Sequence, residues 1–171
     1  MTDYVHQKRF AAFGTRLRRL SERLDREVEA VYREHGVVFE PRWFAVVTVL
    51  DERGAVSVGE LAAVLGVSHA AVSQVRGGLI DAGLVAGRAD PDDRRRQILA
   101  LTPKGRREIA RLKPLWAAIA ASVEALCAEA APGLIDMFTR IEDAMAEKPV
   151  PHRVAELLHT PPKMKKEKSH G

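Results

Sequence analysis

A closely spaced series of helix and turn signals between residues 57 and 83 constrains the fold more than any other part of the chain. Ser57 is followed three residues later by Glu60, the spacing of a capping box, in which each side chain accepts a bond from the other's backbone N–H at a helix start. Gly66 can adopt the left-handed conformation that ends this helix, and Ser68 can cap the next helix. Two short helices joined this tightly form a helix-turn-helix.

The second of these helices, predicted to end at Gly83, has two contrasting sides. Val72, Val75 and Leu79 lie on one side at helical spacing and are predicted to face the core. With about 100° between successive residues, the other side carries small and polar residues that leave room for another molecule. The residues on that side and at its first turn are Ser68, His69, Ala70, Ser73, Gln74 and Gly77.

A hairpin with a charged tip is predicted to follow. Residues 84–88 and 97–101 have the composition and length of two strands, and residues 89–96 connect them. The segment 88–96 contains four arginines and three aspartates. Helix, turn, helix and charged hairpin in this order form a winged helix-turn-helix, so the predicted fold class is mainly α with a small β-hairpin wing.

The chemistry of this block favours duplex DNA. An α-helix fits the major groove, where polar side chains near its N-terminus contact base edges and phosphates. Gln74 can form a bidentate pair with adenine, and Ala70 can meet a thymine methyl group. Ser73 and His69 can bond bases or phosphates. Arg76 lies about 60° from the centre of the buried side and is assigned to a phosphate contact or to packing.

The wing is predicted to supply further contacts. We expect Arg94 and Arg95 to enter narrow minor grooves, whose negative potential attracts arginine. Asp90 or Asp93 is expected to pair with Arg88 and fix the turn. A solvated loop is the alternative for such a run of charges. The predicted DNA-binding residues are Ser68, His69, Ala70, Ser73, Gln74, Arg76, Arg88, Arg94, Arg95 and Arg96.

Amphipathic helices are predicted on both sides of this block. Apolar residues recur every three or four positions from Phe10 to Val31, which predicts one long helix that ends near Gly36. A partner helix is the simplest cover for such a long stripe, and packing within the monomer is the alternative. Residues 41–53 are predicted to form a second helix with Pro41 in its first turn.

On the other side, Thr102-Pro103 predicts the start of a long helix, which Pro114 is expected to kink or interrupt. After Pro132-Gly133 a further helix is expected, and residues 160–171 are predicted to be disordered. The predicted division is an N-terminal dimerisation helix (1–36), a DNA-binding domain (37–102), C-terminal dimerisation helices (103–147) and a basic tail (148–171).

A longer pattern joins these signals: Leu61-x6-Ser68-x3-Val72-Ser73, then Leu79-Ile-Asp-Ala-Gly83-Leu84-Val85-x2-Arg88-x4-Asp93-Arg94-Arg95-x5-Leu101-Thr102-x2-Gly105. With it the chain resembles the MarR family of bacterial transcription regulators, closely over residues 41–105 and by hydrophobic pattern in the flanking helices. Gln74 and Gly77-Gly78 depart from that pattern, because similar regulators carry larger or charged residues there.

This resemblance implies a homodimer that is held by its N- and C-terminal helices and binds a pseudo-palindromic operator. The residues predicted to form the dimer interface are Phe10, Phe13, Leu17, Leu20, Ile119, Val123, Leu126, Leu134, Phe138 and Ile141. The resemblance also implies a small aromatic or lipophilic effector. Phe39, Trp43 and Phe44 are the candidate effector pocket, with core packing as the alternative.

The predicted function is therefore a sequence-specific transcriptional regulator of duplex DNA, a repressor that an effector relieves. Two other functions fit the same residues. One is a non-specific architectural DNA-binding protein, and the other is a protein-interaction module that keeps the fold without DNA affinity. The excess of 27 Lys and Arg over 23 Asp and Glu, a net charge of +4, permits a polyanionic partner. Aromatic residues make up 5% of the chain, which offers few stacking platforms for single strands.

Other classes of function find little support in the sequence. His69 and Ser73 have no acid placed to orient them and no Gly-x-Ser-x-Gly turn, so we expect no catalytic site. The six histidines lack paired ligand spacing, and we expect neither a metal nor a cofactor. Cys127 is expected to be a small core residue rather than a redox sensor. Without a signal peptide or a membrane-length apolar run, a cytoplasmic protein with no membrane partner is expected.

Overall fold

The computed structural model describes residues 3–91, 93 and 96–159 and divides the chain into two units, Met1–Ile119 and Ala120–Gly171. Each unit is described by itself. The wing residues Arg94 and Arg95 and the predicted disordered segment 160–171 lie outside the described residues.

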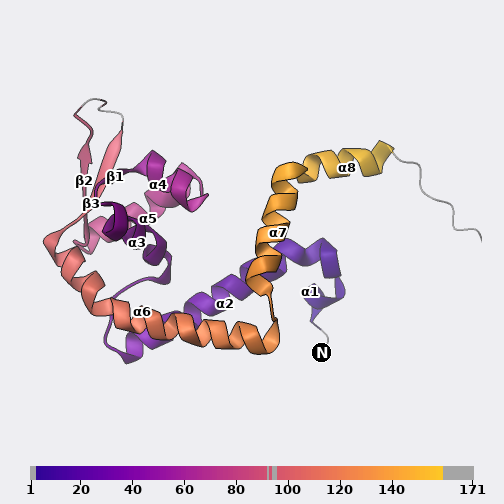
Figure 1. The fold of residues 1–171 in the computed structure, drawn as a ribbon, viewed down its shortest axis with the longest axis horizontal. Coiled ribbons are helices and arrows are strands. Elements are labelled where there is room, and N and C mark those ends of the chain that lie inside the picture. Colours follow the sequence, from indigo (N-terminus) through magenta and orange to yellow (C-terminus); the bar gives the residue numbers. More distant parts are fainter. Residues whose placement is uncertain (1–2, 92, 94–95, 160–171) are drawn as a thin grey trace, which may run out of the picture. The chain divides into compact units, whose positions relative to one another are not determined.

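The first unit contains a chain of short elements between two long helices (Figure 1). Its elements are α1 (Tyr4–Gln7), the 3-10 helix η1 (Arg9–Ala12), α2 (Phe13–Glu34), the 3-10 helix η2 (Pro41–Trp43), α3 (Phe44–Arg53), β1 (Val56–Ser57), α4 (Val58–Leu65), α5 (His69–Asp81), β2 (Val85–Ala89), β3 (Gln97–Leu101) and most of α6 (Pro103–Ala130). The second unit contains the end of α6, α7 (Leu134–Glu147) and α8 (Val150–His159). The predicted long N-terminal helix is confirmed over α2, whereas Phe10 lies before it in η1.

The helix ends follow the signals in the sequence. Ser57 Oγ accepts from the Glu60 backbone N–H at 3.2 Å, and Glu60 Oε2 accepts from the Ser57 backbone N–H at 2.9 Å, so the capping box is complete. Gly66 ends α4 with a φ of 64°, and Ser68 caps α5 through the N–H of Ala71. These interactions satisfy backbone groups that a short helix would otherwise leave unpaired.

The sheet has three antiparallel strands in the order β1-β3-β2, so the predicted two-stranded hairpin was incomplete. β2 and β3 form the expected hairpin, with Val85 opposite Leu101 and Ala89 opposite Gln97. β1 adds two residues at the other edge, where Val56 lies opposite Leu99. A two-residue strand shows no alternation of apolar and polar residues, and periodicity therefore could not predict it.

The core of the first unit lies where the sheet meets the helices. Leu61 of α4, Leu79 of α5 and Leu99 of β3 are each 0% exposed. Ile109 and Leu112 of α6 belong to the same cluster. Because each element contributes a fully buried apolar side chain, sliding one of them past another would open a cavity, which costs about 2 to 5 kcal/mol for each leucine lost. This packing holds α5 in place.

The C-terminal half differs from the prediction in two respects. Pro114 does not interrupt α6, since it lies inside one continuous helix, and a kink there stays a prediction. Part of the predicted basic tail forms α8, in which Val150, Val154 and Leu157 recur at helical spacing and Pro151 occupies the first turn, where proline is tolerated. In the described part of the chain, no helix alone is long and apolar enough to span a membrane, and two bent helix pairs pass on length and composition only.

The glycine pair in α5 has two different environments. A Cβ added at Gly78 would lie 3.0 Å from Cζ2 and 3.2 Å from Nε1 of Trp43, whereas a Cβ at Gly77 would meet nothing within 4 Å. Trp43 is 5% exposed, and its indole therefore has little freedom to move aside. Gly78 is thus required for close approach of α5 to Trp43, and Gly77 is not.

Gly77→Ala and Gly78→Ala test this difference as a matched pair. We expect Gly77→Ala to raise the free energy of unfolding by about 0.5 to 1 kcal/mol, because alanine favours helix. Gly78→Ala makes the same gain but overpacks Trp43 at a cost of about 1 to 3 kcal/mol. Urea denaturation should show Gly78→Ala to be the less stable variant, and equal stabilities would contradict the close contact.

The capping box of α4 gives a second test. Ser57→Ala should lower the free energy of unfolding by about 1 kcal/mol, because it removes the cap of α4. Ser73→Ala, at an exposed serine inside a helix, should change it little. Thermal denaturation of the two variants provides the comparison.

The acid of the box adds a pH dependence. Hydrogen bonds from Ser57, assisted by the charge of Arg96, hold the pKa of Glu60 below its ordinary value of 4.5. The ionised form therefore stabilises the fold above pH 4.5, and this contribution is lost as the pH falls through the lowered pKa. The stability difference between the wild type and Glu60→Gln should shrink over that range, and a constant difference would refute the role of the charge.

Candidate nucleic-acid interface

α5 presents its polar side to solvent, as the spacing of its residues predicted. Val72 and Leu79 are 1% and 0% exposed, and Val75 packs partly against the core. The predicted contact residues Ser68, His69, Ala70, Ser73 and Gln74 are exposed, as is Gly77. Arg76 is partly buried, in keeping with its place near the edge of the buried side. The exposed side combines hydrogen-bonding groups with small residues, which suits close approach to base edges.

A cleft of about 540 Å³ joins this helix to α4 and to the start of β3. Four predicted DNA-binding residues meet in it: His69, Ser73 and Arg76 of α5, and Arg96, the residue before β3. A Cβ at Gly59, in the first turn of α4, would lie 3.3 Å from Cε1 of His69, so the imidazole packs over α4. The cleft is lined by Ser57, Val58, Gly59, Glu60, Ala63, His69, Ser73, Arg76, Arg96 and Gln97.

The base of the wing differs from the prediction. Arg88 lies exposed in β2, opposite Ile98. Asp90, which was expected to pair with Arg88, forms an ion pair with Arg96, with Oδ2 3.8 Å from Nε. The same guanidinium reaches Glu60 at 3.5 Å. Arg96 therefore turns toward acidic groups of the protein, and no local pattern in the sequence indicated these partners.

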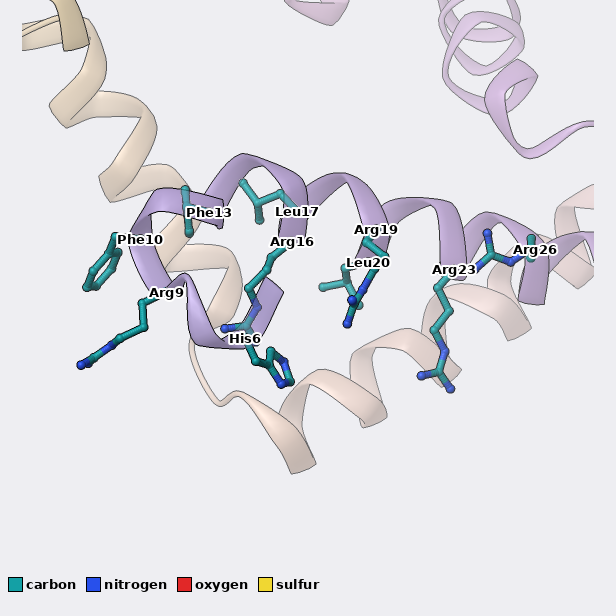
Figure 2. Close-up of a pocket in the computed structure, with 10 residues that line it drawn as sticks. All are labelled: His6, Arg9, Phe10, Phe13, Arg16, Leu17, Arg19, Leu20, Arg23 and Arg26. Atoms are coloured by element: carbon teal, nitrogen blue, oxygen red, sulfur yellow. The ribbon is translucent and has the colours of Figure 1, made fainter. Parts of the chain in front are cut away.

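An apolar stripe bordered by arginines extends along η1 and α2 (Figure 2). It forms a groove of about 820 Å³. Arg19 donates to Asp3 at 2.6 Å, and this bond lowers the pKa of Asp3 to about 2. The groove is lined by His6, Arg9, Phe10, Phe13, Arg16, Leu17, Arg19, Leu20, Arg23 and Arg26. The predicted interface residues Phe10, Phe13, Leu17 and Leu20 are exposed on this stripe.

The C-terminal residues predicted to form the dimer interface have mixed environments. Ile119 packs partly against the core of the first unit. In the second unit, Val123 and Leu134 are partly exposed. Leu126, Phe138 and Ile141 are exposed.

Phe39, Trp43 and Phe44, the candidate effector pocket, belong to an aromatic cluster. Phe39 and Trp43 are 6% and 5% exposed and pack edge to face, with ring centroids 5.4 Å apart. Phe44 is 43% exposed and packs edge to face on Trp116 at 5.0 Å. The structure thus places Phe39 and Trp43 in the core and leaves Phe44 accessible. Trp43 Nε1 is buried without a hydrogen-bond partner.

Two members of this cluster were missed by the sequence analysis. Trp116 Nε1 donates to Tyr32 Oη at 3.0 Å, across 84 positions of sequence. Burial raises the pKa of Tyr32, which keeps the phenol neutral, and the bond from Trp116 opposes this shift. A contact between residues so distant in sequence has no signal in local periodicity. Within the described residues, no group of His, Cys, Asp and Glu could hold a metal ion.

The comparisons with known proteins agree with this geometry. Residues 39–96 match the model of the MarR family. The transcriptional repressor CouR bound to a 23-mer DNA duplex is 24% identical, with a TM-score of 0.61 over 85% of this chain and 98% of CouR. The PcaV transcriptional regulator from Streptomyces coelicolor, in complex with its natural ligand, is 20% identical, with a TM-score of 0.59 over 86% of this chain and 99% of PcaV.

A third solved structure concerns regulation of DNA binding. BpsR of Bordetella bronchiseptica, whose DNA binding is regulated by 6-hydroxynicotinic acid, is 23% identical, with a TM-score of 0.55 over 78% of this chain and 98% of BpsR. No curated protein sequence matches the chain. The matched family and these neighbours are transcriptional regulators rather than enzymes. Residues 39–96 of this chain accordingly resemble the winged helix-turn-helix of the MarR family, and the fold resembles that of solved regulators over most of the chain.

Proposed function

We propose that the protein is a sequence-specific transcriptional repressor that binds a pseudo-palindromic DNA operator as a homodimer. One observation carries the proposal: α5 is fixed by a fully buried apolar side and offers small and polar residues on its exposed side. A helix held in this way can enter a major groove without losing its contacts to the rest of the domain. The DNA-bound structure of CouR, which shares the fold, supports the proposal.

In this proposal each surface has a distinct task. Gln74 and Ala70 contact base edges, and Ser73 and His69 contact bases or phosphates. Arg76 and Arg88 contact phosphates, which fixes the register of the protein on the duplex. For Arg94 and Arg95, which lie outside the described residues, minor-groove contacts are proposed from the sequence alone.

The apolar stripe of α2 supports the proposal of a homodimer. The stripe is bordered by arginines, two of which, Arg19 and Arg23, pair with acids of the same chain. α7 has four acidic residues and one arginine, Arg140, beside its exposed Phe138 and Ile141. Pairing α2 of one copy with α7 of the other would cover both apolar faces and join opposite charges. Two copies related by a two-fold axis would place their recognition helices about 34 Å apart, one turn of DNA.

The proposal also includes a small-molecule effector. PcaV was solved with its natural ligand and BpsR responds to 6-hydroxynicotinic acid, which supports a small aromatic effector for this chain. Phe44 is the accessible member of the aromatic cluster, and Trp43 connects that cluster to Gly78 of α5. An effector bound there would alter DNA affinity only if it binds the DNA-competent arrangement of α5 and a second, DNA-incompetent arrangement with unequal affinity.

A comparison of Gln74→Ala and Arg88→Ala tests the DNA contacts. Selection of bound duplexes from a random library supplies the operator, and binding is then measured over a range of salt concentrations. Gln74→Ala should lose about 1 to 3 kcal/mol of discrimination at one or two base pairs. Arg88→Ala should weaken binding to every sequence and lower the salt slope by about one phosphate contact.

Three outcomes of this experiment would contradict the proposal. Equal, sequence-blind losses in both variants would refute the division of roles. A wild-type preference that random competitor duplex erases would favour an architectural protein, and the absence of duplex affinity at low salt would favour an interaction module.

The dimer is tested by its mass in solution. We expect light scattering to give twice the mass of one chain. Leu20→Glu places a charge on the apolar stripe and should raise the dissociation constant of the dimer about tenfold or more, because burial of an unpaired charge is costly. Val38→Glu introduces the same charge at a valine that is 87% exposed outside the stripe, and it should leave the dimer intact. Equal effects of both variants would exclude this face as the interface.

A further inference from the structure

Arg96 closes the loop of the wing at its base. Its carbonyl accepts from the Asp90 N–H at 3.0 Å, and its own N–H donates to the Asp93 carbonyl at 2.8 Å. These two backbone bonds bring the beginning and the end of the loop together immediately before β3. The position of the Arg96 side chain is therefore tied to the position of the loop.

The guanidinium of Arg96 connects this loop to α4. Nη2 donates to Ser57 Oγ at 3.4 Å and lies 3.5 Å from Glu60 Oε2. Nε lies 3.8 Å from Asp90 Oδ2. Ser57 and Asp90 are 4% and 8% exposed, so two of the three partners of the guanidinium are buried. A buried carboxylate is stable only beside a cation or hydrogen-bond donors. The guanidinium of Arg96 therefore compensates part of the cost of burying Asp90.

The position of this contact makes it relevant to DNA binding. Ser57 and Glu60 form the cap of α4, and the cleft that contains them also contains His69 and Ser73 of α5. A guanidinium that bonds both the wing and this cap fixes the distance between the wing and the recognition helix. Setting that distance in advance favours DNA binding, because less conformational freedom is lost when two surfaces fit neighbouring grooves at once.

We propose that Arg96 is a positioning residue that holds the wing against the capping box of α4, and that it does not itself contact DNA. This inference rests on the proposed DNA-binding function and departs from the assignment of Arg96 as a DNA contact from the sequence. Arg88, also exposed near the base of the wing, remains the proposed phosphate contact there.

The sign of the effect of Asp90 distinguishes the two roles. Removing a negative charge from a DNA-binding face strengthens binding on electrostatic grounds alone. If Asp90 acts by holding Arg96, Asp90→Asn instead weakens operator binding, by about two- to fivefold for a partly exposed ion pair. Glu52→Gln, at an exposed acid of α3, is the matched control and should bind the operator as tightly as the wild type or more tightly.

A double-mutant cycle completes the test. Operator affinity is measured for Asp90→Asn, Arg96→Gln and the double variant. The positioning role predicts that both single variants weaken binding and that the double variant is no weaker than the weaker single one. Retained or tighter binding by Asp90→Asn, or additive losses in the double variant, would overturn the inference and assign Arg96 to a direct contact.

A measurement without DNA separates this inference from the proposed function. Hydrogen exchange of the Asp90 amide, which bonds the Arg96 carbonyl, should accelerate severalfold in Arg96→Gln and in Glu60→Gln, because both loosen the loop. Glu60→Gln removes the charge that pairs with Arg96 but keeps an oxygen that can accept the bond of the cap. It therefore tests the ion pair while α4 remains folded. Unchanged exchange rates would refute the positioning role even if the protein binds DNA. Accelerated exchange in a protein that does not bind DNA would refute only the proposed function.

Discussion

The burial of one side of α5 is the interaction on which the rest of the domain depends. Leu79 and Val72 lie in the same cluster as Leu61 of α4 and Leu99 of β3, and all four are almost fully removed from solvent. Gly78 allows the helix to approach Trp43 more closely than a residue with a Cβ would. Because this side is fixed, the small and polar residues of the other side are held in one orientation. The proposed role of α5 as a recognition helix depends on that property, since base contacts depend on angles as well as distances.

Ser57 and Glu60 perform three tasks within four residues. Ser57 belongs to β1, caps α4 and accepts a bond from Arg96, and Glu60 completes the cap and pairs with Arg96. The start of the helix-turn-helix, the edge of the sheet and the base of the wing therefore share one small polar cluster. A partly buried polar cluster of this kind is stable when its members satisfy one another, and losing one member leaves the others unpaired. The wing and the helix-turn-helix are in this way parts of a single proposed DNA-binding surface.

Local signals predicted the elements well where a residue type has a specific structural role, such as capping a helix or ending it. The serine caps, Gly66 after α4 and the two strands of the hairpin all lie where the sequence placed them. Prediction failed where the signal was too short or misleading. β1 has two residues and no periodicity, and α8 begins in a proline-containing segment whose composition suggested a tail. Pro114 does not interrupt α6, although it removes one backbone hydrogen bond from the helix.

The sequence by itself determined the helices from α2 to α7, where α5 begins and which side of α5 is polar, because caps and periodicity act within a few residues. Only the tertiary structure decided what each charged or aromatic side chain meets. It paired Asp90 with Arg96, bonded Trp116 to Tyr32, and placed Phe39 and Trp43 in the core while leaving Phe44 accessible. These contacts join residues whose separation in space depends on how the elements pack, and packing is a property of the whole domain rather than of any local pattern.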